Sequence, residues 1–392
     1  MNTRAPRTIL ISGAGIAGPA LAFWLHRHGF AVTVVEQSAT VRTGGYPIDL
    51  RGTAVEVARR MGILPRLQDL HVRTRRLVAL DADGSLVASL SSQVTDGDGH
   101  QHLEVRRGDL TETLYGLVED TVEFVFNDSI HSLDEHADGV DVVFDSGVRR
   151  PFSLVIGADG LHSRTRGLVF GPEKDFHHYL GYCFAGFTMP NFLGLSHEAM
   201  LWSSPGKGAA LYAVKDSDEV HGFLNFVRPD APLEAFRDPE AQRELVAETF
   251  AGEGWEIPRM VAAMNQADDL FFDVVSQIRM PHWSSGRVSL IGDAGYATSF
   301  LTGQGTSLAL VGAYMLAHAL ATHSDHTAAF AAYERDTRDF VTLNQGLVTE
   351  GKATMFPATP EALAERNAML RRLDFLPTEM VRPEHSALTL PD

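Results

Sequence analysis

The chain has 392 residues, 44% of them hydrophobic, which is enough to bury a large core and predicts two or three interlocked domains. Acidic residues outnumber basic ones by 50 to 33, and the net charge of -17 disfavours nucleic acid and anionic lipid as partners. Cys183 is the only cysteine, which excludes an intramolecular disulfide and a multi-cysteine metal site.

The first apolar run, Ile9 to Leu25, follows two arginines and superficially resembles a secretory signal. It carries Gly13, Gly15 and Gly18 at the spacing of a nucleotide-binding loop, lacks a convincing cleavage site and continues into a helix and a strand. The only other long apolar stretch, Leu308 to Leu320, is too short to span a bilayer. We therefore expect a cytoplasmic protein that does not enter a membrane.

Residues 8 to 36 predict one strand-helix-strand unit. Its three elements are Thr8–Ser12, Ala17–His28 and Ala31–Glu36. The glycine-rich segment Gly13-Ala14-Gly15-Ile16-Ala17-Gly18 joins the first strand to the helix, where small residues let backbone amides approach a pyrophosphate. Glu36 ends the second strand, where a carboxylate can accept hydrogen bonds from ribose hydroxyls. This unit predicts a Rossmann-type sheet and a dinucleotide, but it cannot separate FAD from NAD.

Helices and strands alternate in the rest of the chain. After a Gly- and Thr-rich loop over Thr40–Gly52, we expect helices at Ala54–Met61 and Asp109–Glu119 and strands at Arg76–Leu80, Val140–Phe144 and Leu154–Gly157. Residues 171–282 are rich in aromatic residues and strand-like pieces, namely Cys183–Met189, Ala209–Val214 and His221–Val227. A buried strand and three helices follow, at Arg287–Gly292, Gly305–Thr322, Ala328–Gln345 and Pro360–Leu373.

Two further motifs follow buried strands. One is the segment from Gly157 to Arg166, which reads GADGLHSRTR, and the other is Leu290-Ile291-Gly292-Asp293-Ala294-Gly295, with Gly303-Gln304-Gly305 opening a helix. Asp293 can accept a hydrogen bond from a ribityl hydroxyl, and the amides of Gly303 to Gly305 offer a helix dipole to a flavin ring. Taken singly, Asp159 and Asp293 are explained equally well as caps of turns and helices.

Together, GxGxxG, GADGxxSxxR and GD followed by GQG resemble the flavin-dependent aromatic hydroxylases of the para-hydroxybenzoate hydroxylase type, and the tetracycline-inactivating monooxygenases look like the closer branch. The resemblance covers Ile9 to about Leu320. It implies an α/β fold in which a Rossmann-like FAD-binding domain with a mixed sheet is interleaved with a β-sheet substrate domain and closed by C-terminal helices. The ranges are 1–170 and 283–350 for the FAD-binding domain, 171–282 for the substrate domain and 351–392 for the C-terminal segment.

The resemblance implies FAD as cofactor, NADPH or NADH as a transient co-substrate, and O2. The cofactor-binding residues that it implies are Gly13, Gly15, Ile16, Ala17, Gly18, Glu36, Gln37, Asp49, Arg107, Asp159, Asp293, Gly303, Gln304 and Gly305. Arg107 would reach the phosphate and ribityl region, and Asp49, in the loop from Gly44 to Leu50, would face the flavin. Asp159 would link the FAD region to the nicotinamide route, and Asp293 would bind the ribityl chain.

The resemblance has departures. The family often reads Gly-Asp-Ala-Ala-His at the third motif, where this chain has Gly295 and Tyr296, and its usual Asn after the glycine-rich turn is replaced by Ser307. We predict that a visiting nicotinamide nucleotide passes a groove near Arg42, Arg164 or Arg166. The candidates for the substrate pocket are Phe187, Tyr212, Phe223, Asn225 and Phe300, with Met355 and Phe356 closing it; core packing is the competing explanation for each.

The predicted function is hydroxylation of a small aromatic or polyketide-like substrate by a FAD-dependent monooxygenase that uses NAD(P)H and O2 through a flavin C4a-hydroperoxide. The chemistry is centred on the flavin, so we expect no catalytic triad and no metal site; His177 and His178 are adjacent and are explained as surface residues. Two alternatives remain: a flavin oxidoreductase acting on a polycyclic natural product without net oxygen insertion, and a non-catalytic flavin- or nucleotide-binding protein. The protein would be a monomer or homodimer.

Overall fold

The strand β1 lies inside a six-stranded sheet of the computed structural model, which describes residues 7–43, 45–91, 102–232, 238–349, 357–373, 375 and 382–392. The strand order is β17-β18-β11-β1-β2-β7, parallel from β18 to β7 and antiparallel only between β17 and β18. The strands are β1 (Thr8–Ser12), β2 (Ala31–Glu36), β7 (Glu123–Phe126), β11 (Leu154–Gly157), β17 (Ser284–Ser285) and β18 (Val288–Leu290). The carboxyl ends of five strands therefore share one edge.

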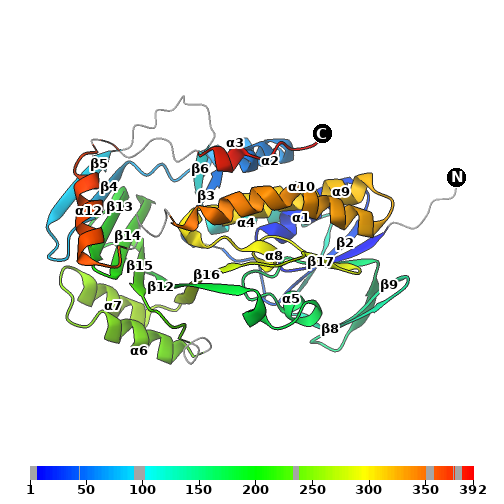
Figure 1. The fold of residues 1–392 in the computed structure, drawn as a ribbon, viewed down its shortest axis with the longest axis horizontal. Helices are drawn as coiled ribbons and strands as arrows, with labels where there is room; N and C mark the ends of the chain where they lie inside the picture. The colour runs from blue at the N-terminus through cyan, green and yellow to red at the C-terminus, as the bar shows by residue number, and fades with distance from the viewer. Residues whose placement is uncertain are drawn as a thin grey trace.

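Alternating side chains of this sheet pack against two different layers. Ile9 and Ile11 join a core with the helices α1 (Ala17–Arg27), α9 (Gly305–Thr322) and α10 (His326–Gly346), which pack on one another. Leu10, between them, faces a three-stranded sheet of β8 (Ile130–His136), β9 (Gly139–Phe144) and β10 (Arg149–Phe152). Figure 1 shows the helices on one side of the parallel sheet and β8 and β9 on the other. The predicted α/β fold is confirmed.

A second sheet has seven strands in the order β16-β12-β15-β14-β13-β4-β5. They are β4 (Arg76–Leu80), β5 (Leu86–Ser91), β12 (His177–Pro190), β13 (Ser196–Ser204), β14 (Lys207–Asp216), β15 (Glu219–Val227) and β16 (Phe271–Ile278). The helices α6 (Pro239–Thr249) and α7 (Ile257–Gln266) pack on one face, as Figure 1 shows. The helix α12 (Pro360–Leu370) packs on the other face through Leu370.

Smaller elements connect the two sheets. The two-stranded sheet of β3 (Pro47–Arg51) and β6 (His102–Arg106) flanks β4 and β5 in the chain, since β3 precedes β4 and β6 follows β5. The short helices are α2 (Thr53–Met61), α3 (Leu64–Asp69), α4 (Arg107–Gly116), α5 (Arg164–Val169) and α8 (Asp293–Tyr296), and the 3-10 turns are Glu173–Asp175, Phe300–Thr302 and Pro383–Ser386.

The second sheet differs from the sequence prediction in two ways. By pairing, β4 and β5 belong to it although they precede residue 170, because β4 lies parallel to β13. The helices α6 and α7 were not predicted within 171–282. In α6 only Val246 is buried, so the sequence lacks the apolar periodicity that predicts a helix. The one local indication of this helix is Asp238, whose side chain caps it ahead of Pro239.

The helix α9 has 18 residues, Gly305 to Thr322, and is the one helix in the described part of the chain that is long and apolar enough to cross a membrane. The helix starts three residues before Leu308 and ends two after Leu320, so it is longer than the apolar stretch that was judged too short to span a bilayer. However, 78% of it is buried inside the protein, between α1, α2 and α10. This burial explains its apolar composition as that of a core helix.

Candidate active site

The three glycines of the first motif are explained by three different features of the structure. Gly13 has a φ of +107°, and a Cβ there would lie 2.5 Å from the carbonyl oxygen of Ala158. A Cβ on Gly18 would lie 1.9 Å from the carbonyl oxygen of Gly13, so α1 can pack on β1 only with glycine here. A Cβ on Gly15 would meet nothing within 4 Å. The loop is therefore closed by Gly13 and Gly18 and open at Gly15, as a backbone that approaches a pyrophosphate requires.

Glu36, at the end of β2, turns back towards this loop. Its Oε2 accepts a hydrogen bond from the amide of Ala14 at 2.7 Å, and its Oε1 accepts one from the amide of Ser38 at 2.9 Å. A carboxylate has further lone pairs, so these two bonds orient the group without saturating it. Gln37, beside it, is exposed. The structure thus places the predicted ribose-binding carboxylate next to the glycine loop.

The register of the parallel strands brings the second and third motifs to the same edge. Ser12 at the end of β1 is paired with Gly157 of β11, and Gly157 is paired with Leu290 of β18. The third motif then turns at Gly292, where a Cβ would lie 3.1 Å from the side chain of Ala17 in α1. The first and third motifs, far apart in the sequence, are therefore in contact.

Asp293 is the first residue of α8 and faces the start of α9. Its Oδ1 lies 3.7 Å from the place that a Cβ on Gly305 would occupy. Its side chain has solvent-accessible surface, yet burial raises the pKa of Asp293 above its ordinary value, and the charge of Arg107 opposes that shift. The two observations agree if Asp293 lies in a recess, reached by water but surrounded by protein atoms.

The helices α1 and α9 begin at this recess without a side-chain cap. Their N-cap residues are Ile16 and Gln304, and neither first turn contains an acidic residue. Uncapped first turns leave backbone N–H donors and the positive end of the helix dipole available to an anionic or carbonyl oxygen. Gln304 is fully buried, donates from Nε2 to the carbonyl oxygen of Gly303 at 3.1 Å, and leaves Oε1 without a partner among the described residues.

Asp49 on β3 lies beside the same turn. Its Oδ2 is 3.0 Å from the position of a Cβ on Gly303 and accepts a hydrogen bond from Nη2 of Arg51 at 2.8 Å. Its Oδ1 lies 2.8 Å from Nε2 of His102. Burial alone would raise the pKa of Asp49, but His102 and Arg51 hold it below its ordinary value, so the group stays ionised. The amide of Arg51 donates to Oγ of Ser307 at 3.1 Å, so the residue that departs from the family pattern fastens β3 to α9.

Arg107 and the loop before β3 complete this side. The amide of Arg107 donates to the carbonyl oxygen of Tyr46 at 3.1 Å, and a Cβ on Gly45 would lie 3.6 Å from the Cβ of Arg107. Burial raises the pKa values of Tyr46 and Asp293, and the charge of Arg107 opposes this shift at both groups. The guanidinium of Arg107 therefore lies close enough to the recess to act on it. Gly44, which precedes this loop, lies outside the described residues, as do Met355 and Phe356.

The second motif folds on itself. Asp159 accepts hydrogen bonds from Oγ of Ser163 at 2.6 Å and from the amide and hydroxyl of Thr165, both at 2.9 Å. These bonds make Asp159 a cap of its own turn. Its predicted role on the nicotinamide route stays a prediction.

The arginines proposed for the nicotinamide groove differ. Arg166 is fully buried and donates to the carbonyl oxygen of Ala294 at 2.9 Å and to Glu173 at 2.8 Å, so its side chain does not face a visiting nucleotide. It ties α5 to α8 instead. Arg164 is exposed and paired with Asp145 at 2.5 Å, and Arg42 is exposed. A groove near Arg42, Arg164 or Arg166 stays a prediction.

His162, which the sequence reasoning passed over, bridges the two sheets. Its Nδ1 lies 2.8 Å from Glu173, and its Nε2 lies 3.2 Å from Asp273 of β16. Hydrogen bonds with Asp273 and Glu173 raise the pKa of His162 to about 10, so the ring is protonated at neutral pH. Glu173 is eleven positions from His162 and Asp273 is 111, so no local sequence pattern indicates that the three residues meet.

An aromatic cluster faces the recess from the second sheet. Phe184 of β12 and Phe223 of β15 are stacked with centroids 5.6 Å apart, and the ring of Tyr46 lies 5.9 Å from Phe223 and 6.3 Å from Phe184. Phe300, ahead of α9, lies 4.9 Å from Phe184. The ring centroid of Phe271 lies 6.0 Å from that of Phe184. We call these five residues the aromatic wall; it connects the loop before β3, the second sheet and the turn before α9.

Two of the predicted pocket residues, Phe223 and Phe300, belong to the aromatic wall, and Phe187 does not. Phe187 is paired with Gly222 and is buried on the other face of β12, in the core under α6 and α7. Phe184, three positions earlier, is paired with Asn225 and so points to the same face as the wall. Asn225 is 8% exposed, and its Oδ1 has no partner among the described residues.

Tyr212 on β14 belongs to a polar group at one end of this face. Its hydroxyl donates to Oε1 of Glu104 at 2.6 Å, and the hydroxyl of Thr74 donates to Oε2 at 3.0 Å. Burial and the charge of Asp49, its cross-strand partner, raise the pKa of Glu104. Two neighbouring carboxyl groups thus have pKa values moved in opposite directions, a pattern common at sites that handle protons.

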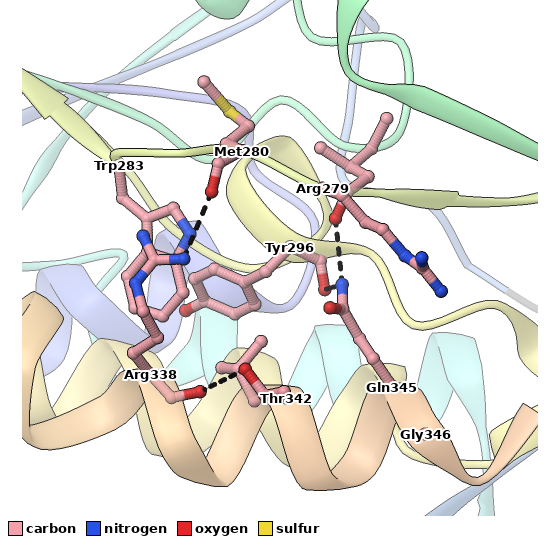
Figure 2. Close-up of a pocket in the computed structure, with 10 residues that line it drawn as sticks. Arg279, Met280, Trp283, Tyr296, Arg338, Thr342, Gln345 and Gly346 are labelled. Carbon is pink, nitrogen blue, oxygen red and sulfur yellow. Dashed lines mark hydrogen bonds between the residues drawn. The ribbon is translucent and has the colours of Figure 1, made fainter.

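A separate cavity of about 380 Å³ lies between α10, α8 and the segment after β16, and Figure 2 shows its lining. Three of its polar side chains are bonded to backbone oxygens: Arg338 donates to Met280 at 3.1 Å, Gln345 to Ile278 at 2.8 Å and Thr342 to Arg338 at 2.9 Å. No predicted cofactor residue lines it. We assign this cavity to the attachment of α10 and not to chemistry.

The residues present fit an extended dinucleotide that carries a planar ring. The glycine loop is open at Gly15, two helices begin uncapped, Asp293 lies in a recess between them, and the aromatic wall stands at the end nearest Asp49. The fold and the site therefore define a dinucleotide-dependent oxidoreductase in which cofactor and substrate regions come from different sheets.

Comparison with known proteins specifies this class. A family model described as FAD binding domain matches residues 7–344, and the chain belongs to that family, which includes the aromatic hydroxylases of the para-hydroxybenzoate hydroxylase type. A flavin-dependent monooxygenase of an unknown prokaryotic organism is 40% identical over 366 residues, 92% of this chain and 94% of the relative. One from Legionella longbeachae serogroup 1 (strain NSW150) is 34% identical over 384 residues, 97% of this chain and 98% of the relative.

Among solved structures, the crystal structure of tetracycline destructase Tet(55) superposes with a TM-score of 0.86 at 37% identity and covers 99% of both chains. The protein is thus an FAD-dependent monooxygenase, as the motif order predicted.

Proposed function

We propose that the protein uses NAD(P)H and O2 to hydroxylate a small aromatic or polyketide-like substrate held against the aromatic wall. The observation that carries this proposal is the contact between that wall and the cofactor region: Tyr46, which belongs to the loop before β3, packs edge-on against Phe184 and Phe223 of the second sheet. Aromatic faces favour a flat, apolar ligand. The similarity to a tetracycline destructase supports a polyketide-like substrate class.

In this proposal the cofactor is held largely by backbone groups. The amides around Gly15 and the start of α1 take the pyrophosphate, Glu36 the adenosine ribose and Asp293 the ribityl chain, with Arg107 close to both phosphate and ribityl groups. The uncapped start of α9 directs its amides at the ring. We propose 1–170 and 283–350 as the FAD-binding domain, less β4 and β5, and 171–282 as the substrate domain with those strands added.

When bound, FAD supplies hydride acceptance from a nicotinamide and activation of O2. The chain's own residues orient the substrate and keep water from the reacting centre, and the aromatic wall serves both purposes. Phe271 and Phe300 are 42% and 37% exposed, so they form its rim, while Phe184 is buried. Glu104, whose pKa is raised, accepts the hydrogen bond of the Tyr212 hydroxyl, and we assign to this pair the exchange of a proton with a substrate hydroxyl.

The proposal is tested by screening aromatic and polyketide-like compounds, tetracycline among them, against the purified holoenzyme. We expect a substrate to stimulate NADPH or NADH oxidation and labelled dioxygen to leave one labelled oxygen atom in the product. The Gly15→Val variant, expected to lack FAD, is the control. Stimulated NAD(P)H oxidation with an altered product and no label would instead identify an oxidoreductase that inserts no oxygen, and a protein that no nicotinamide reduces with any compound would contradict both.

A further inference from the structure

The helix α12 lies over the same face of the second sheet as the aromatic wall. The cross-strand register defines one row on that face, in which Phe223 is followed by Ala210, Leu201 and Ala79. Phe223 at one end packs on Tyr46, and Ala79 at the other end packs in a cluster that includes Leu370 of α12. The wall and α12 are therefore two sides of one region, and Figure 1 shows α12 opposite the FAD-binding part.

The row between those two sides keeps exposed surface at its middle. Ala210 and Leu201 are both partly exposed although they lie on inner strands. In the next row Asn225 is followed by Gly208 and Ser203, and all three are buried. The exposed surface of Ala210 and Leu201 leaves room above them for a ligand.

Arg366 is the charged group that α12 turns towards the sheet. It shares the buried side of the helix with Leu363 and Asn367 and is 7% exposed. Its Nε donates to Oδ1 of Asn367 at 3.0 Å, but its Nη2 is buried without a hydrogen-bond partner among the described residues. Asp81 acts on Arg366 electrostatically and forms no ion pair with it in the described part of the chain. A guanidinium remains charged in proteins, so this largely buried cation has no anionic partner among the residues that the structure describes.

Burying such a charge is costly unless an anion compensates it. A structural arginine is expected to pair its guanidinium with carbonyl or carboxylate oxygens. The buried Arg166 leaves only Nε without a partner, and its Nη atoms donate to Ala294, Leu161 and the carboxylate of Glu173. Arg366 contrasts with Arg166 because no carboxylate among the described residues pairs with it. On the same face, Asn225 offers a second buried polar atom without a partner, Oδ1.

We propose that Arg366 is a specificity-determining residue that binds an anionic oxygen of the substrate, a carboxylate or an ionised enol or phenol, at the α12 end of the pocket. This inference rests on the proposed function and narrows its substrate class to flat aromatic acids. The anionic group lies on Arg366, the adjoining ring lies over Leu201 and Ala210, and a hydroxyl or amide hydrogen of the substrate donates to Oδ1 of Asn225.

The test compares two probes that differ in charge alone, 3-hydroxy-2-naphthoate and its primary amide, titrated into the holoenzyme and followed by the absorbance and fluorescence of FAD. We expect the wild type to bind the acid at least about tenfold more tightly than the amide. The Arg366→Met variant should lose this preference. The Arg371→Met variant removes an exposed arginine from the end of the same helix and should keep it. A wild type without preference, including one that binds neither probe, overturns the inference.

Thermal unfolding of the same holoproteins separates binding from folding. If Arg366 serves a ligand, Arg366→Met should unfold at the wild-type temperature or above, because it removes an uncompensated buried charge. The acid probe should stabilise the wild type and Arg371→Met but not Arg366→Met. An Arg366→Met variant that unfolds well below the wild type while Arg371→Met does not would show a structural role and overturn the inference.

Failure of this inference can be told apart from failure of the proposed function. A holoprotein that inserts labelled oxygen into a substrate, yet binds acid and amide alike, contradicts only the assignment of Arg366. A protein that binds no flavin contradicts the proposed function itself, whatever the probes show.

Discussion

The two ligand-binding regions of this protein are specified by different parts of the chain. At the carboxyl edge of the six-stranded sheet, the geometry is set by backbone: Gly13 and Gly18 permit the close approach of β1, β11 and α1, and Gly15 leaves the loop open. On the open face of the seven-stranded sheet, the geometry is set by side chains, and Phe184 and Phe187 on one strand have opposite environments. A cofactor that many relatives share suits the first kind of site, and a substrate that varies suits the second.

The largest effect should come from the open position of the glycine loop. We expect Gly15→Val to fold but to purify almost without FAD, because the new side chain meets no protein atom and fills the space that the pyrophosphate needs. Flavin content per chain, measured by absorbance, checks this. Gly116→Val is the matched control, since a Cβ at Gly116 also meets nothing within 4 Å but lies at the end of α4. Full flavin occupancy in Gly15→Val would show that the pyrophosphate does not lie against the glycine loop.

The second prediction uses the two faces of β12. Phe187→Ala should lower the free energy of unfolding by about 3–5 kcal/mol, because it empties a core site under α6 and α7, and should leave KM for substrate nearly unchanged. Phe184→Ala should raise KM and the share of NAD(P)H lost as hydrogen peroxide, with a smaller loss of stability. Denaturant unfolding and steady-state kinetics measure both. A larger change of KM in Phe187→Ala than in Phe184→Ala would reverse our assignment of the faces.

These two regions also differ in how far the sequence predicts them. Strands and motifs at the first edge follow from local patterns, and β1, β2 and β11 begin and end at the predicted residues. That the three motifs lie at the same edge of the sheet is predictable too, because parallel strands align their carboxyl ends. The aromatic wall depends on the register of β12 against β15, which nothing local in the sequence encodes. Phe223 and Asn225 lie on the pocket face of β15, and the register places Phe184 on that face and Phe187 on the other. Alternation along β12 alone shows that the two residues face opposite sides, but not which of them faces the pocket.

Long-range pairing explains the remaining differences. β4 lies parallel to β13, more than a hundred residues later, so the chain enters the second sheet before its FAD-binding part is finished. Arg166 and His162 stand in the same motif, yet one is buried against α8 and the other reaches β16. A motif indicates which residues are close in the chain, and only the fold decides which of them faces the ligand.

The third prediction concerns Glu104, at the boundary of the two regions. Burial and Asp49 raise its pKa above the ordinary 4.5, so the folded protein holds this proton more tightly than the unfolded chain does. Its contribution to stability is present below the unfolded pKa and is lost as pH rises through the folded pKa. Glu104→Gln keeps an acceptor for Tyr212 and removes the charge. We expect it to be more stable than the wild type at pH 8 by on the order of 1–2 kcal/mol and equal to it at pH 4.5.

Thermal unfolding at both pH values measures this difference, and Glu112→Gln, which changes a carboxylate within α4, is the control. If Glu104→Gln is less stable than the wild type at pH 8, the carboxylate is stabilised by the fold, and the assignment of the proton to Glu104 is wrong.

The smallest effect should come from His162, the direct bridge from the second motif to β16. Its pKa of about 10 means that its bonds to Glu173 and Asp273 contribute stability fully below pH 6.5, which is lost as pH rises through about 10. The side chain is 45% exposed, so solvent screening keeps the contribution below about 1 kcal/mol. His162→Gln should therefore be slightly less stable than the wild type at pH 7, and the difference should disappear above pH 10. His136→Gln, which changes an exposed histidine 3.8 Å from Asp141, is the matched control. An unchanged deficit of His162→Gln above pH 10 would mean that the ring holds the two sheets together by packing rather than by charge.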